Sequence, residues 1–228
     1  MMKTGAITRN RLRGAAFVVM TLFAAIDGTA VAKETVAWTG QDASVRAFMP
    51  VYGQTLPPIG FVQFCRSRPG ECSLGSGGAA REHLTEARWD ELVKVNDYVN
   101  AKVAPVTDQD LYQVPELWTY PDDKGDCEDY VLLKRRYLVN LGWSTESLLI
   151  TVVRDRNGDG HAVLTVVTDL GEFILDNQNT DILPWQATRY QFQKRQSQTH
   201  PSVWVTLRPE NNEPKARGTL TGVLEVPK

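Results

Sequence analysis

The sequence has little net charge, few cysteines and few histidines, and each shortage narrows the possible functions. Its 228 residues carry a formal net charge of −2, with 25 basic and 27 acidic side chains. Because no basic stripe with interleaved aromatics occurs either, a nucleic-acid partner is not expected. Beyond the first 32 residues there is no apolar run long enough to span a bilayer, so the remainder is expected to be soluble.

The N-terminal region has the three parts of a secretory signal peptide. A basic start is followed by the apolar run "GAAFVVMTLFAAI" and by "AVA" at Ala30–Ala32, where small residues permit cleavage. We expect residues 1–32 to be removed on export to the periplasm or the cell exterior; an uncleaved membrane anchor is the alternative. Residues 33–208 then suffice for one domain, and residues 209–228 are expected to form a mostly mobile tail.

An oxidising compartment changes the interpretation of the three cysteines. Cys65 and Cys72 flank a Pro-Gly turn signal in "FCRSRPGEC", and a disulfide closing this loop would stabilise the fold by about 2.5 kcal/mol. A metal clip is the competing interpretation, but no further His or Cys flanks the pair. Cys127 is left over, either as a reactive thiol or as a link between two copies of the chain.

The apolar periodicity predicts two helices and a three-stranded meander. Apolar residues at helical spacing run through "LTEARWDELVKVNDYVNAKV", with Thr85 as N-cap, and a second helix starts at Cys127 and ends before Gly142. The runs "SLLITVVRD", "GHAVLTVVTD" and "GEFILDNQ" follow as antiparallel strands, and "PSVWVTL" is one further strand. The predicted fold class is therefore α+β. The expected loops cover residues 33–60, 75–80 and 104–125.

The segment "GDCEDY" places Cys127 in the first turn of a helix and among carboxylates. The partial positive charge of a helix N-terminus lowers a thiol pKa, and its free N–H groups can bind an oxyanion. Asp126, Glu128 and Asp129 have the opposite effect on the thiol, although acids in this position also stabilise the helix. Since the thiolate is the nucleophile, something must offset these charges if Cys127 is to react.

A thiol nucleophile needs a base, and the sequence offers His83, His161 and His200. His161 opens the strand "HAVLTVV", where we expect its side chain to be accessible from the sheet edge. The next strand ends at Asp176, so the hairpin brings these two residues to the same end of adjacent strands. Because an Asp fixes the tautomer of a neighbouring His, Cys127, His161 and Asp176 fit the roles of nucleophile, base and orienting residue. The other two histidines are expected at the surface.

The combination of "GDCEDY", "DGHAVL" and "LDNQ" resembles the bacterial transglutaminase-like cysteine peptidases over residues 118–204. The resemblance implies a papain-like or transglutaminase-like core, with the catalytic Cys at a helix N-terminus packed on an antiparallel sheet that carries the His and Asp. The family's triad maps onto Cys127, His161 and Asp176.

The same resemblance implies a cofactor and partners. Calcium would bind beside the cysteine through Asp126, Glu128 and Asp129, and its charge would cancel the repulsion that opposes the thiolate. A surface adhesin is implied as the protein substrate, in the context of biofilms, and a cyclic-di-GMP-responsive inner-membrane receptor as the inhibitor. A second calcium motif is not expected: "DRNGDG" matches the first half of an EF-hand loop, but its twelfth position is Val166, so a hairpin turn is predicted.

The sequence therefore predicts an exported cysteine endopeptidase that forms a thioester acyl-enzyme. Two alternatives stay open. A transglutaminase would use the same triad and resolve the acyl-enzyme with an amine, and a non-catalytic calcium-binding periplasmic module would keep the triad as a relic.

Overall fold

The computed structural model describes residues 47–72 and 80–209. The expected signal peptide over 1–32, most of the expected loop over 75–80 and nearly all of the expected tail over 209–228 lie outside the described residues. Within the described ranges, no helix combines the length and the apolar character needed to cross a membrane.

A seven-stranded sheet lies at the centre of the described chain, and neighbouring strands in it pair antiparallel. In sheet order the strands are β1 (Gly53–Thr55), β9 (Trp204–Thr206), β8 (Gln191–Gln196), β4 (Leu148–Arg154), β5 (Gly160–Thr168), β6 (Gly171–Leu175) and β7 (Leu183–Pro184). The predicted meander is β4, β5 and β6, and the predicted further strand is β9. Two short strands, β2 (Ala104–Pro105) and β3 (Lys124–Gly125), form a separate parallel pair.

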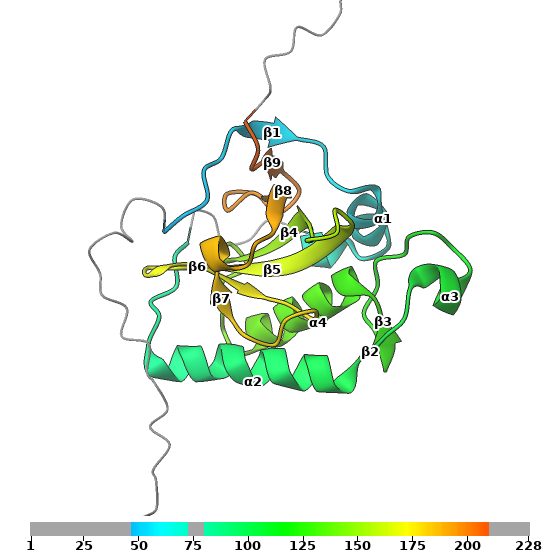
Figure 1. Ribbon diagram of the computed structural model, residues 1–228, viewed down its shortest axis with the longest axis horizontal. Helices are drawn as coiled ribbons and strands as arrows, with labels where there is room; N and C mark the ends of the chain where they lie inside the picture. The colour runs from blue at the N-terminus through cyan, green and yellow to red at the C-terminus, as the bar shows by residue number, and fades with distance from the viewer. Residues whose placement is uncertain (1–46, 73–79, 210–228) are drawn as a thin grey trace, which may run out of the picture. The chain divides into compact units, whose positions relative to one another are not determined.

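Helices cover one face of the sheet. The helical elements are α1 (Ile59–Ser67), α2 (Glu86–Lys102), α3 (Asp108–Tyr112), α4 (Cys127–Asn140) and the 3₁₀ turns η2 (Pro69–Cys72) and η3 (Trp185–Ala187). Figure 1 shows α2 and α4 lying side by side beneath the sheet, and α4 packs on β5. The described part of the chain is therefore α+β with an antiparallel sheet, as the sequence predicts.

Local sequence signals explain both long helices. The Thr85 hydroxyl accepts a hydrogen bond from the backbone N–H of Arg88 at 3.2 Å and so caps α2, as predicted. Helix α4 begins at Cys127, also as predicted, with Asp126 in the N-cap position. It ends where Gly142 adopts a φ of +84°, a left-handed conformation that glycine reaches without a steric penalty.

The sheet carries apolar clusters on both faces. Along β5, Ala162 and Leu164 belong to the larger cluster, which includes residues of α2 and α4, whereas Val163 belongs to a smaller cluster on the other face. Phe61 of α1 and Trp204 of β9 extend the larger cluster, with ring centroids 5.2 Å apart in an edge contact. Because both faces are covered, β5 reads as a nearly continuous buried strand.

Several elements were not predicted, among them β1 within the expected loop over 33–60 and β2 and β3 within the expected loop over 104–125. Helix α3 has only five residues and also lies within the expected loop over 104–125. Helix α1 follows a proline-rich stretch, which favours a loop interpretation of the sequence there. Strand β8, "QFQKRQ", lacks the alternation of polar and apolar residues that marks a strand. Its Arg195 is nevertheless buried, because it forms an ion pair at 2.7 Å with Glu172 of β6. Tertiary contacts, and not local pattern, therefore define β8.

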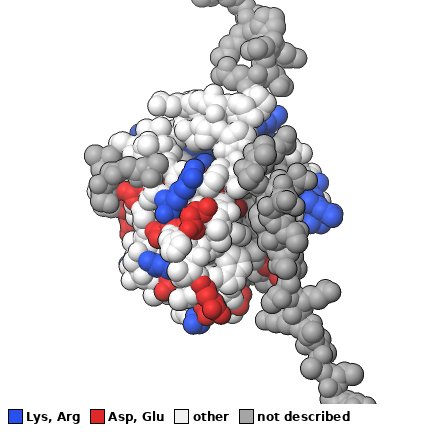
Figure 2. All heavy atoms as spheres, turned by 90° about the vertical axis from the view of Figure 1, so that its left-hand side faces the viewer, with Lys and Arg blue, Asp and Glu red and all other residues white. Residues whose placement is uncertain are grey.

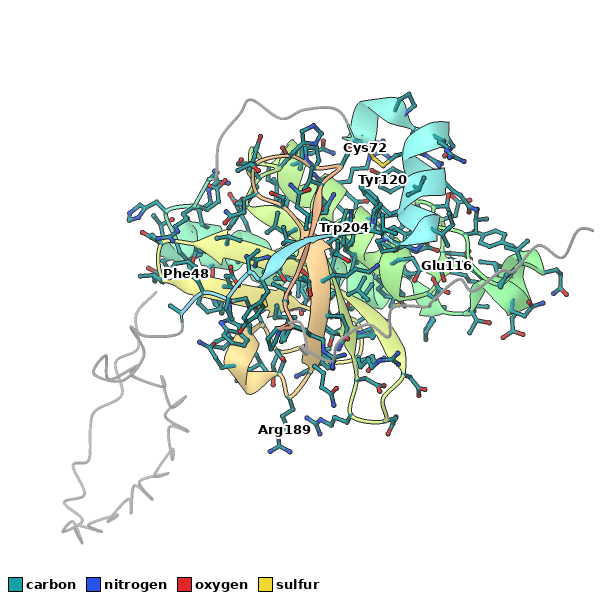
Figure 3. All side chains as sticks on the ribbon, turned by 90° about the horizontal axis from the view of Figure 1, so that it is seen from above. Phe48, Cys72, Glu116, Tyr120, Arg189 and Trp204 are labelled. Carbon is teal, nitrogen blue, oxygen red and sulfur yellow. A yellow bond between two sulfur atoms is a disulfide. The ribbon has the colours of Figure 1, made fainter. Side chains whose placement is uncertain are left out.

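The predicted disulfide between Cys65 and Cys72 is present and ties α1 to η2, with 5.6 Å between the two Cα atoms. Figure 3 shows the bond at Cys72, with Tyr120 close by. It leaves Cys127 as the free cysteine, and all three cysteines of the chain lie within the described residues. The face of the molecule shown in Figure 2 carries acidic and basic side chains interspersed, in keeping with the small net charge.

Candidate active site

Cys127 lies at the first turn of α4, beside strand β5. Its thiol donates a hydrogen bond to Glu128 Oε2 at 3.2 Å. The backbone N–H of Ala162, the residue that follows His161, also faces the thiol and acts to lower its pKa. The fold thus brings the cysteine next to the strand position of the predicted base.

The surroundings of Cys127 disfavour the thiolate when no cation is present. Burial raises the pKa of the thiol most, and the charge of Glu128 and the hydrogen bond to it add to the effect. Asp126 contributes in the same direction, so the pKa lies well above the ordinary value. These groups therefore oppose the ionisation of Cys127 that a helix N-terminus favours.

His161 and Asp176 form a buried hydrogen-bonded pair. His161 Nε2 lies 2.8 Å from Asp176 Oδ1, and the two side chains are 2% and 3% exposed. Burial raises the pKa of Asp176, but the hydrogen bond and charge of His161 oppose this, together with a hydrogen bond from Tyr190, and the net pKa is lowered. The predicted pairing is confirmed. The expectation that His161 is accessible from the sheet edge is wrong, because Asp176 and the ring of Tyr190 cover it.

The β5–β6 hairpin explains how residues 15 positions apart meet. Leu164 of β5 pairs with Leu175 of β6, so the chain entering β5 and the chain leaving β6 lie at the same end of the hairpin. The preceding "DRNGDG" segment is a turn, as predicted: Asp155 Oδ1 accepts from the backbone N–H groups of Asn157 at 2.8 Å and Asp159 at 3.0 Å.

Helix α2 holds the segment that follows Asp176. Asn100 Nδ2 donates to the backbone carbonyl of Asp176 at 2.9 Å, and Asn96 Nδ2 donates to that of Thr180, also at 2.9 Å. The two asparagines are four residues apart and so share one helix face. Between these anchors, Gln178 Nε2 lies 3.4 Å from His161 Nδ1, the ring nitrogen that does not contact Asp176.

Three carboxylates converge beside Cys127. Ligand atoms of Asp108, Asp126 and Glu128 lie within 4.8 Å of one another. Each of these side chains has one buried oxygen, Asp108 Oδ1, Asp126 Oδ1 and Glu128 Oε1, without a hydrogen-bond partner among the described residues. Burial and the charge of Asp126 raise the pKa of Glu128 to about 9. Clustered, unpartnered carboxylate oxygens are the donor set that a hard divalent cation takes, so these residues fit a calcium ion.

The predicted calcium ligands and this cluster overlap without coinciding. Asp126 and Glu128 belong to the cluster as predicted, but its third member is Asp108 and not Asp129. The Asp129 carboxylate instead turns toward Gly125 and accepts a hydrogen bond from the backbone N–H of Thr119 at 2.9 Å. Burial raises its pKa to about 8. One oxygen of Asp129 thus anchors the loop before α4, while Oδ2 is buried without a hydrogen-bond partner among the described residues.

A polar pocket of about 460 Å³ adjoins the His161–Asp176 pair. Asp176 and Gln178 contribute to its lining, as do Tyr190 and residues of the β4–β5 turn such as Arg156. Both Asp176 and Gln178 also lie within 3.4 Å of the His161 ring, so the pocket borders the candidate base. Trp118 is buried and packs on Phe61 with ring centroids 5.9 Å apart.

The two histidines predicted at the surface differ in burial. The His83 side chain is 83% exposed, and its Nδ1 lies 2.5 Å from Asp169 Oδ2. His200 is half-buried near the chain's last described residues. Sequence reasoning missed Asp108 and Tyr190. Gln178 lies in the quoted "LDNQ" segment, but no pattern distinguished it from its neighbours.

A family model for the bacterial transglutaminase-like cysteine proteinases (BTLCP) matches residues 51–212, which is most of the chain. The chain belongs to this family. The matched range contains Cys127, His161 and Asp176. Membership makes it a cysteine proteinase by family, and a protein substrate is implied at that general level.

Solved structures of LapG from Legionella pneumophila are similar to this BTLCP chain. The calcium-bound LapG chain is 27% identical over 47% of this chain and 64% of its own length, with a TM-score of 0.43. The EGTA-treated LapG chain is 26% identical over 51% of this chain and 66% of its own length, with a TM-score of 0.45. The chain thus spans less than two thirds of the first of these relatives. A search of curated proteins found no match.

Proposed function

We propose that this BTLCP chain is an exported cysteine endopeptidase with Cys127 as nucleophile, His161 as general base and Asp176 as the residue that orients His161. The observation that carries the proposal is the buried 2.8 Å contact between His161 Nε2 and Asp176 Oδ1. His161 lies on β5, and the next residue of this strand faces the free thiol of Cys127. A buried His–Asp pair beside a cysteine at a helix N-terminus supplies the groups of a papain-like catalytic centre.

In the proposed reaction, the Cys127 sulfur attacks the carbonyl carbon of a peptide bond, and the thiol proton passes to His161. Because Nε2 contacts Asp176, Nδ1 is the atom that receives this proton. The imidazolium then returns the proton to the leaving amine as the C–N bond breaks, which leaves a thioester on Cys127. Water, deprotonated by His161, hydrolyses the thioester and restores the thiol.

The oxyanion that forms at each attack needs hydrogen-bond donors. The first N–H groups of a helix have no partner within the helix, so the backbone N–H of Cys127 is the candidate donor. Asp176 keeps Nε2 protonated and stabilises the imidazolium, a role that its lowered pKa supports because it stays ionised at neutral pH.

Calcium is proposed as a cofactor held by Asp108, Asp126 and Glu128. A divalent cation there would supply positive charge beside Cys127 and so offset the carboxylates that oppose its ionisation. The unpartnered oxygens of the cluster support this assignment. Asp129, the remaining acid of the motif, stays a prediction as a ligand.

The finer aspects of the function remain predictions, some from the N-terminal signal pattern and the chain length and some from the family resemblance. These are a papain-like core within a domain over residues 33–208, removal of residues 1–32, a location in the periplasm or outside the cell, a surface adhesin as substrate and a cyclic-di-GMP-responsive receptor as inhibitor.

The test is cleavage of an internally quenched peptide library by the full chain in calcium, compared with the Cys127→Ala variant. We expect cleavage to fall by at least about 10³-fold in the variant, while its melting temperature stays close to that of the parent. His83→Ala serves as a control, because it removes a surface histidine that also contacts an aspartate.

Two outcomes would contradict the proposal. Cleavage retained by Cys127→Ala would exclude Cys127 as the nucleophile. Incorporation of dansylcadaverine into a glutamine peptide, without peptide cleavage, would instead assign the chain as a transglutaminase.

A further inference from the structure

Tyr190 contacts both members of the buried His161–Asp176 pair. Its hydroxyl donates a hydrogen bond to Asp176 Oδ2. Its ring lies 5.7 Å from the His161 ring between centroids, with 60° between the planes. Tyr190 packs against the smaller apolar cluster, so it approaches the pair from the side of the sheet opposite α4.

The hydrogen bonds to Asp176 assign a separate partner to each oxygen. Oδ1 accepts from His161 Nε2 at 2.8 Å and from the backbone N–H of Gln178 at 3.1 Å. Oδ2 accepts from Tyr190. Because Asp176 is only 3% exposed, loss of the phenol would leave a largely buried carboxylate oxygen without its protein donor. The orientation of the carboxylate plane therefore depends on the phenol.

We propose that Tyr190 is a positioning residue of this site, whose hydroxyl holds Asp176 Oδ2 and thereby fixes the carboxylate that orients His161. The inference rests on the proposed roles of His161 and Asp176. The Tyr190 hydroxyl bonds to Asp176 and not to His161, so the effect of this hydroxyl passes through Asp176.

Tyr190 directly precedes β8, and the backbone before it turns its side chain inward. Arg189 adopts a φ of +60°, a left-handed conformation that is uncommon for a residue with a side chain. In Figure 3 its side chain projects away from the body of the molecule. The next residue, Tyr190, points to Asp176, and its backbone N–H donates to the Thr188 hydroxyl at 3.4 Å. The turn at Arg189 therefore places the Tyr190 phenol next to the His161–Asp176 pair.

The charges around the pair are compatible with Tyr190 as a neutral donor. Burial raises the pKa of Tyr190, and its hydrogen bond to Asp176 raises it further, so the phenol stays protonated at neutral pH. From the β4–β5 turn, Asp155 acts in the same direction and Arg156 opposes it.

One further ionisable group faces Asp176 from α4. Burial lowers the pKa of Lys134 to about 7, while the charges of Asp176 and Asp97 act to raise it. Titrations of Asp176 must therefore be compared between variants that all keep Lys134. Tyr190→Phe meets this condition, since it removes the hydroxyl and keeps both the ring contact with His161 and the wall of the pocket.

The experiment compares Tyr190→Phe with Tyr98→Phe, a control that removes the phenol of the exposed Tyr98, whose ring contacts Tyr137. One readout is the Asp176 midpoint from carboxyl ¹³C NMR, which does not depend on peptidase activity. The second is the rate of Cys127 alkylation by iodoacetamide at pH 7 in calcium. We expect Tyr190→Phe to raise the Asp176 midpoint and to slow alkylation by about tenfold, and Tyr98→Phe to change neither.

A double variant separates positioning from a structural role. If Tyr190 acts through Asp176, Tyr190→Phe slows alkylation no further in the Asp176→Asn background, whereas independent effects would multiply. An unchanged Asp176 midpoint, or multiplying effects in the double variant, would overturn the proposal. A shifted midpoint in a protein that cleaves no peptide would overturn the proposed peptidase function and leave the Tyr190–Asp176 contact supported.

Discussion

The two halves of the candidate site differ in how their polar groups are satisfied. On the imidazole side, both oxygens of Asp176 and both ring nitrogens of His161 face polar partners within the described residues. On the thiol side, Asp126 and Glu128 each have a buried oxygen without such a partner, and Asp108 supplies a third. The His161–Asp176 pair is thus held by protein groups, whereas the carboxylates beside Cys127 keep unpartnered oxygens.

The difference indicates that protein groups satisfy the His161–Asp176 pair, whereas the carboxylates beside Cys127 need a cation. Buried polar groups that lack a partner cost free energy, and clustered carboxylates cost more because they repel one another. Such an arrangement persists where it binds something, and a divalent cation has the right charge and ligand preference. The following predictions test the two halves in turn, from the largest expected effect to the smallest.

The largest effect is expected from Asp176→Asn on the imidazole side. The amide can donate to Nε2 and so favours the tautomer that carries its proton on Nδ1, the atom that should accept the proton of Cys127. We expect a loss of about 10³-fold or more in kcat for peptide cleavage. Asp169→Asn is the matched control, since Asp169 also contacts a histidine but on the surface. Equal losses in the two variants would remove the distinction between the pairs.

On the thiol side, calcium is expected to stabilise the fold. Binding to the folded state alone, at about 100 times the dissociation constant, adds about 2.7 kcal/mol, equivalent to about 5–10 °C in Tm for a chain of this size. We expect this rise in calcium relative to chelator, and expect Asp108→Asn to lose most of it, because Asp108 belongs to the cluster. Asp90→Asn, an exposed acid on α2, is the control. A calcium-induced rise that Asp108→Asn fully retains would place the ion elsewhere.

The pH dependence of stability in chelator sharpens the same point. Burial and Asp126 raise the pKa of Glu128 to about 9 in the folded chain, above its ordinary value of 4.5. A group with a raised folded-state pKa contributes stability that is present below its ordinary pKa and is lost as the pH rises toward the folded value. We therefore expect Tm in chelator to fall between about pH 5 and 9, and Glu128→Gln to flatten the fall. A fall of the same size in Glu128→Gln would assign it to other groups, such as Asp129.

The smallest effect is expected from Asn100→Ala on α2. It removes one hydrogen bond to the backbone carbonyl of Asp176 and should lower the free energy of unfolding by about 1 kcal/mol, with a modest loss of cleavage. Asn140→Ala, at the exposed end of α4, is the control. Denaturant titration measures the difference, and no difference between the two variants would exclude Asn100 as a support of the Asp176 segment.

The sequence predicted those parts of the site that depend on neighbouring residues. Gly125-Asp126 marks the start of α4 at Cys127, and the apolar runs of β5 and β6, with a short turn between them, are enough to pair His161 with Asp176. Each of these features follows from periodicity, turn chemistry and capping within about twenty residues.

The missed residues reach the site through distant pairings. Asp108 lies 18 residues before Asp126 in the sequence. The two come close because Pro105 of β2 pairs with Gly125 of β3, and no sequence pattern predicts a strand pair of two residues. Tyr190 lies close to Asp176 because β8, which follows Tyr190 directly, pairs with β4. Strand β8 has a polar sequence, so its position, and that of Tyr190, depends on the completed sheet.

The most direct test of the account measures the alkylation of Cys127 by iodoacetamide at neutral pH. Cys127 is the one free thiol in the chain, and the denatured protein gives its intrinsic rate. We predict that the folded protein in calcium reacts faster than the denatured protein, and that either chelator or Asp176→Asn removes the acceleration. A folded-state rate at or below the denatured rate, with and without calcium, would mean that the carboxylates keep Cys127 inert and would contradict its role as a nucleophile.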